Sequence, residues 1–83
     1  MEYDLFVVKS ATQAQRMVRT LNSGGIRAGV QRLPLELASR GCAYAVRIVT
    51  ADSEAALSHL QRNGMWPERI VRHDGKGYRE VAP

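Results

Sequence analysis

The stretch that decides the fold runs from Leu5 to Leu21 and reads LFVVKSATQAQRMVRTL. Its first four residues form an apolar run, which predicts a short strand that is buried on both faces. Ser10 or Thr12 then supplies a hydroxyl group that can cap the first turn of a helix. The next apolar residues recur at intervals of three and four, which places them on one helical face: Ala14, Met17, Val18 and Leu21.

The rest of the chain continues this alternation of strands and helices. Gly24 and Gly25 end the first helix, because glycine accepts the left-handed conformation that helix C-termini need. Pro34 interrupts the next strand, because it cannot donate to a sheet ladder. Residues 35–42 predict about one helical turn plus a loop. The remaining elements are strands at 26–31, 43–49 and 69–72, a helix between Asp52 and Asn63, and a hairpin arm at 78–81.

The order strand, helix, strand, loop, strand, helix, strand is typical of the ferredoxin-like βαββαβ pattern. We therefore expect an α+β fold in which two helices cover one face of an antiparallel sheet. Residues 1–83 are expected to form a single domain. A chain of this length buries only about 60–65% of the surface that its unfolded form exposes, so a deep active site is not expected.

The charge is basic but dispersed. The formal net charge is +4, and the 12 basic residues are spread along the chain without a run of like charge. Scattered arginines are more typical of a solvated surface than of a nucleic-acid footprint. The acidic start from Met1 to Asp4 does not resemble a signal peptide, and no apolar run approaches the roughly 20 residues of a membrane span. We expect a cytoplasmic protein that does not bind membranes.

Cys42 is the single cysteine and the most plausible chemical group in the sequence. The thiolate is the reactive form, and Arg40, two residues away, could stabilise it by Coulomb attraction. Gly41 removes side-chain bulk beside the sulfur and lets the backbone bend. The alternative is that Cys42 is a small buried apolar residue at the end of a strand, since cysteine is among the most often buried residue types.

Residues 33–47, which read LPLELASRGCAYAVR, carry a resemblance to a known family. Together with the helix end from Leu21 to Ile26, they resemble a small bacterial family of selenium/sulfur carrier-like proteins. The chain departs from the usual pattern of that family at two positions. Leu35 stands where the family usually has Arg, and Ala43 stands where it usually has Gly. The matching residues are Pro34, Leu37, Ser39, Cys42, Ala45 and Arg47.

This resemblance implies a function for Cys42. The thiol would accept a sulfur or selenium atom as a persulfide or selenosulfide and pass it on, which needs no second local cysteine. Its expected partners are sulfur- or selenium-transfer proteins, and the chain would be a protein cosubstrate and not an enzyme. The residues that would support the site are Pro34, Ser39, Arg40 and Gly41.

Two other classes of function remain open. The domain could be a binding or regulatory module that dimerises or binds a ligand on its sheet, with Cys42 in a structural role. It could also bind RNA, which requires exposed aromatic side chains on the sheet. Phe6 is expected in a buried strand and Trp66 at the edge of the core, and the three tyrosines form no visible cluster. The sequence therefore argues against the binding of nucleic acid.

The remaining polar residues predict no metal site and no cofactor. Zinc sites need closely spaced ligand pairs, whereas Cys42, His59 and His73 are far apart in the sequence. His59 is expected on the solvated face of the second helix, and His73 is expected to be exposed before a turn. Asp52 and Glu54 are explained by capping and by the helix dipole.

Overall fold

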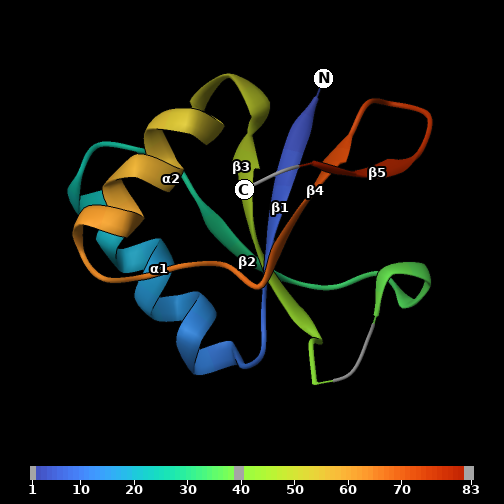
Figure 1. Cartoon of the computed structure of the whole chain (residues 1–83), viewed down its shortest axis with the longest axis horizontal. Helices are drawn as coiled ribbons and strands as arrows, with labels where there is room; N and C mark the ends of the chain where they lie inside the picture. Colours follow the sequence, from blue (N-terminus) through green and yellow to red (C-terminus); the bar gives the residue numbers. More distant parts are fainter. Residues whose placement is uncertain (1, 39–40, 82–83) are drawn as a thin grey trace.

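The computed structural model describes residues 2–38 and 41–81. In these residues, two helices pack on a five-stranded antiparallel sheet (Figure 1). The expected α+β class is confirmed. The strands are β1 (Tyr3–Val8), β2 (Gly29–Arg32), β3 (Tyr44–Val49), β4 (Arg69–His73) and β5 (Tyr78–Val81). The helices are α1 (Ala11–Ser23) and α2 (Ser53–Arg62), with single 3-10 turns at η1 (Leu35–Leu37) and η2 (Thr50–Asp52).

The strands lie in the order β2-β3-β1-β4-β5, so β1 is central. Tyr3 pairs with Val49 of β3 on one side and with His73 of β4 on the other. The apolar run from Leu5 to Val8 is completely buried, which confirms the prediction of a strand covered on both faces. The predicted hairpin arm pairs with β4 and adds a fifth strand to the expected βαββαβ order.

The larger part of the core lies between the two helices and one face of the sheet. The predicted stripe of α1 points into it, since Ala14, Met17 and Leu21 are buried. Ser10 caps this helix, because its Oγ accepts a hydrogen bond of 3.1 Å from the backbone N–H of Gln13. The core residues on this face are Phe6, Val8, Val46, Ile48 and Ile70 from the sheet, and Ala56 and Leu60 from α2.

The contact between the two helices depends on a glycine. The Nε2 atom of His59 lies 3.1 Å from the carbonyl oxygen of Thr20 in α1. A Cβ atom at Gly24 would lie only 2.7 Å from that same Nε2 atom. His59 is thus half-buried between the helices, and its predicted place on a solvated face is wrong, because Gly24 leaves space for the imidazole ring.

Four other local predictions differ from the structure. His73 was expected to be exposed but is half-buried, because its ring packs against Tyr3 and Tyr78. Strand β2 starts three residues later than expected, and Val30 is 41% exposed because β2 is an edge strand.

Trp66 is 57% exposed and does not pack at the edge of the core. The neighbouring Met65 packs there instead, against the core between the helices and the sheet. Asp52 occupies the N-cap position of α2, but its side chain makes no capping hydrogen bond.

Candidate functional site around Cys42

The face of the sheet opposite the helices, called here the helix-free face, carries a second apolar cluster. Its strand residues are Leu5, Val7, Ala45 and Val71. The segment between β2 and β3 crosses this cluster and contributes Leu33, Leu37 and Cys42 to it. In Figure 1, the η1 turn of this segment lies on the opposite side of the sheet from α1 and α2.

Cys42 lies two residues before β3, and only 7% of its surface is exposed. Its neighbours Gly41 and Ala43 are both exposed. Gly41 has a φ of +71°, a left-handed conformation that glycine adopts at little cost. The backbone N–H of Leu33 donates a 2.9 Å hydrogen bond to the carbonyl oxygen of Ala43, which fixes the two ends of the segment beside each other. The cysteine is therefore a free thiol just beneath the surface.

The predicted supporting residues fall into two groups. Gly41 adjoins Cys42 and turns the chain, while Pro34 starts the η1 turn and accepts a 2.9 Å hydrogen bond from the N–H of Leu37. Ser39 and Arg40 lie outside the described residues.

Arg69, which the sequence did not single out, ties the η1 turn to the sheet. Its guanidinium group donates a hydrogen bond to the carbonyl oxygen of Leu37. The same group pairs with Glu80 of β5 at 3.3 Å. Because Leu37 packs on the cluster that contains Cys42, this bond helps to hold the cover of the thiol in place.

Beside this cluster, four planar side chains form a row across the helix-free face. We call Arg47, Tyr3, His73 and Tyr78 the planar row. The guanidinium carbon of Arg47 lies 4.1 Å from the centre of the Tyr3 ring. The other neighbour of Tyr3 is His73, whose ring is stacked on it with a centroid distance of 4.8 Å and an interplanar angle of 12°. Tyr78 meets His73 edge to face at 4.7 Å.

The planar row joins β3, β1, β4 and β5, so among its members only His73 and Tyr78 are close in the sequence. Strand alternation could have placed Tyr3 on the same face as Leu5 and Val7. The turn at residues 74–77 could have placed His73 opposite Tyr78. The sequence did not reveal the order of the strands, which brings Tyr3 next to His73 and so completes the row.

The two phenols of the row are linked. Tyr3 Oη and Tyr78 Oη lie 3.2 Å apart and share a hydrogen bond. This bond and partial burial raise the pKa of Tyr78 to about 12. The ring of His73 is fixed by the turn, because its Nδ1 accepts a 3.2 Å hydrogen bond from the N–H of Gly75.

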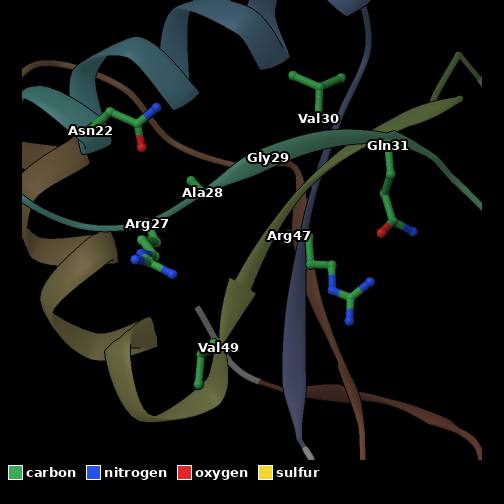
Figure 2. A pocket seen from close by; sticks show the side chains of 8 residues that line it. All are labelled: Asn22, Arg27, Ala28, Gly29, Val30, Gln31, Arg47 and Val49. Atoms are coloured by element: carbon green, nitrogen blue, oxygen red, sulfur yellow. The ribbon is translucent and has the colours of Figure 1, made fainter.

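A shallow hollow of about 490 Å³ opens at the edge of the sheet, next to Arg47. We call it the β2 hollow. In Figure 2, the side chains of Arg27, Gln31 and Arg47 all extend below the β2 ribbon, whereas that of Val30 extends above it. Its lining residues are Asn22, Arg27, Ala28, Gly29, Val30, Gln31, Arg47 and Val49.

Two further properties bear on function. Within residues 2–38 and 41–81, no group of three or more His, Cys, Asp or Glu side chains could hold a metal ion. In the same part of the chain, neither helix is long and apolar enough to cross a bilayer.

Residues 2–72 match the model of the family described as "Putative Se/S carrier protein-like". The chain belongs to this family. The matched region contains the helix-side core, the segment over the helix-free face and Cys42. No curated protein and no solved structure matches the chain. In this Se/S carrier-like protein, the resemblance expected from Pro34 to Arg47 is therefore confirmed at the level of the family.

Proposed function

We propose that this Se/S carrier-like protein carries a sulfur or selenium atom on Cys42, as a persulfide or selenosulfide, between a donor and an acceptor protein. The observation that carries the proposal is the family match over residues 2–72, a region that contains the only cysteine of the chain. On this proposal the domain is a carrier and not an enzyme, and its partners are sulfur- or selenium-transfer proteins.

The chemistry requires only the thiol and the donor. Cys42 first releases its proton to water, and the thiolate attacks the terminal sulfur of a donor persulfide. A new bond forms between Cys42 Sγ and that sulfur, while the sulfur–sulfur bond of the donor breaks. The donor leaves as a thiolate with the electron pair, so no external oxidant or reductant is needed. Transfer of selenium from a donor selenosulfide follows the same balance.

The burial of Cys42 suits a carrier in one respect. A persulfide is easily reduced by small thiols, and a thiol that is 7% exposed among leucine and valine side chains is shielded from them. The exposed backbone on both sides, at Gly41 and Ala43, gives a partner protein a place to contact the segment. We propose that partner contact, and not free diffusion of a small donor, brings a donor sulfur to Sγ.

The test is intact-protein mass spectrometry after incubation with glutathione persulfide or its selenium analogue, with and without a cell extract that contains candidate donor proteins. The expected result is a gain of one sulfur or selenium mass on the native wild-type protein when the extract is present, much less with the small donor alone, and none on Cys42→Ala. Heteronuclear NMR spectra would show that Cys42→Ala keeps the fold. A thiol that is modified only after denaturation would contradict the proposal.

A binding or regulatory module is the second candidate, and the packing of Cys42 in the apolar cluster favours it. In this case Cys42 is structural, and the domain acts through ligand binding or through a homodimer. Unchanged partner binding by Cys42→Ala, with a dimer seen by analytical ultracentrifugation, would support this candidate over the carrier.

We also propose that β1 to β4 and the two helices form a ferredoxin-like βαββαβ unit, which β5 extends. The position of β1 between β3 and β4, with β2 outside β3 in an antiparallel sheet, supports this assignment.

A further inference from the structure

The planar row is open at one end. Its last member, Arg47, contacts Tyr3 of β1, and the strand on the other side of Arg47 is β2, at the edge of the sheet. The residue directly opposite Arg47 on β2 is Gly29. A Cβ atom at Gly29 would have nothing within 4 Å. Open space over Gly29 thus lies next to Arg47, whose side chain is exposed and lines the β2 hollow.

The surroundings of this space are cationic and polar. Arg27 precedes Gly29 by two residues, and its side chain extends on the same side of the β2 ribbon as that of Arg47 (Figure 2). Among the described residues, the lining of the β2 hollow includes no carboxylate, and neither arginine takes part in an ion pair. Gln31, on the same side of the β2 ribbon, adds an amide group that can donate and accept hydrogen bonds, whereas Asn22 lies above the ribbon with Val30 (Figure 2).

These features together define a chemical class of ligand. Arginine guanidinium groups stack on nucleobases, and this stacking tolerates all bases. A second guanidinium group nearby binds a phosphate through charge-assisted hydrogen bonds. We propose that the β2 hollow binds a nucleotide, with its base stacked on Arg47 over Gly29 and its phosphate held by Arg27.

This site differs from the expectation drawn from the sequence, which saw no aromatic cluster. The strand order assembles one, because it brings Tyr3, His73 and Tyr78 together behind Arg47. The contact with Tyr3 restrains the Arg47 side chain, so less rotamer freedom remains to be lost on binding. The proposal does not involve Cys42 and stands whether or not the carrier function does.

The first experiment compares four probes by NMR titration of the uniformly ¹⁵N-labelled protein: adenosine monophosphate, adenosine, ribose 5-phosphate and a short single-stranded oligoadenylate. The expected result is saturable shifts of the Gly29 amide and the Arg47 Nε–H signals with the nucleotide, and binding at least about tenfold weaker when the base is missing, as expected for lost stacking. If adenosine monophosphate binds as tightly as the oligoadenylate does per nucleotide, the ligand is a free nucleotide. Binding that requires the strand identifies single-stranded RNA.

Variants of single residues then test the two contacts. Arg47→Lys keeps the charge but removes the planar face, and we expect nucleotide binding about tenfold weaker. Arg27→Gln should lower the slope of log affinity against log salt by about one. Gly29→Val fills the space beside Arg47 and should also weaken binding. Arg62→Gln changes an exposed arginine on α2 that does not line the β2 hollow, so it is the matched control and should bind as the wild type does.

Three results would overturn the proposal. The first is equal binding of the nucleotide and of ribose 5-phosphate, which would show charge attraction without base recognition. The second is wild-type affinity in Arg47→Lys, whose exposed side chain can be exchanged without repacking the core. The third is the absence of saturable binding by all four probes.

Discussion

Asp4 and Arg72 form a two-point ion pair between the central strand and its neighbour β4. Arg72 Nε lies 2.9 Å from Asp4 Oδ1, and Arg72 Nη2 lies 3.1 Å from Asp4 Oδ2. The hydroxyl group of Thr50 donates a third hydrogen bond, of 2.9 Å, to Oδ1. Asp4 is completely buried, so these bonds stand in for hydrogen bonds to water that its carboxylate loses on folding.

Asp4→Asn should destabilise the protein by about 2 kcal/mol, because an amide cannot accept the same set of charge-assisted bonds and leaves Arg72 without a charge partner. Urea unfolding followed by circular dichroism measures this loss. The control is Glu68→Gln, which removes an exposed pair of 3.7 Å with Lys9 and should cost less than about 1 kcal/mol. Equal losses in the two variants would contradict the importance of the buried pair.

The same pair predicts how stability depends on acid pH. Burial raises the pKa of Asp4, but hydrogen bonds from Arg72 and Thr50 outweigh it, so the pKa lies below the ordinary value of 3.8. A carboxyl group whose pKa is lowered by folding contributes to the free energy of unfolding. This contribution is fully present above the pKa of the group in the unfolded chain, and it is lost as the pH falls through the pKa in the folded protein. Urea titrations below about pH 4 should show this loss in the wild type. The free energy of unfolding of Asp4→Asn should change less with pH in this range. Parallel pH profiles of the two proteins would show that the loss does not come from Asp4.

At alkaline pH, Tyr78 should ionise well above the ordinary pKa of a tyrosine. Its bond to Tyr3 raises its pKa to about 12, which should appear as a late step in a titration of absorbance at 295 nm. Tyr3→Phe should move that step toward 10, the ordinary value. Tyr78→Phe should abolish it. Because folding raises the pKa of Tyr78, the stability that this group contributes should be fully present below its pKa in the unfolded chain. It should decline as the pH rises from about 10 to about 12.

Gly24→Ala should cost about 1 kcal/mol, because the added methyl group meets the ring of His59 and must displace it from Thr20. Thermal unfolding of four proteins measures the coupling: the wild type, Gly24→Ala, His59→Ala and the double variant. The double variant should be more stable than the sum of the single losses predicts. Gly77→Ala is the control, since a Cβ atom there would meet nothing within 4 Å. Strict additivity would show that the two residues do not interact.

Arg69→Met should make Cys42 react faster with iodoacetamide in the native protein, by about five- to tenfold, because the η1 turn loses its hydrogen bond from Arg69 to Leu37. Quenched-flow alkylation followed by mass spectrometry gives the rate. Glu80→Gln is the matched variant, since it removes the ion pair of Arg69 but leaves the bond to Leu37. If both variants accelerate the reaction equally, the ion pair and not the turn controls access to the thiol.

The sequence predicted the elements that depend on local spacing. The apolar run at Leu5, the stripe of α1, the turn at Pro34 and the hairpin arm at Tyr78 all follow from rules that act within about seven residues. The family was identified separately and correctly, from the resemblance of the contiguous stretch around Cys42 to a known family.

The parts that were not predicted depend on tertiary contacts. Asp4 and Arg72 are 68 positions apart, and no local rule joins them. The burial of Cys42 depends on Leu33 and Leu37, which fold over the helix-free face. His59 looked solvated because its own helix does not reveal the gap that Gly24 leaves in the other helix.

The central position of β1 has a consequence for how the chain acquires its fold. Both neighbours of β1 come late in the sequence, since Tyr3 pairs with Val49 and with His73. Contacts between such distant residues carry a high entropic cost before they form, which slows folding. During synthesis, β1 therefore leaves the ribosome before the two strands that pair with it have been made. Its apolar run is not covered by its partner strands in that interval.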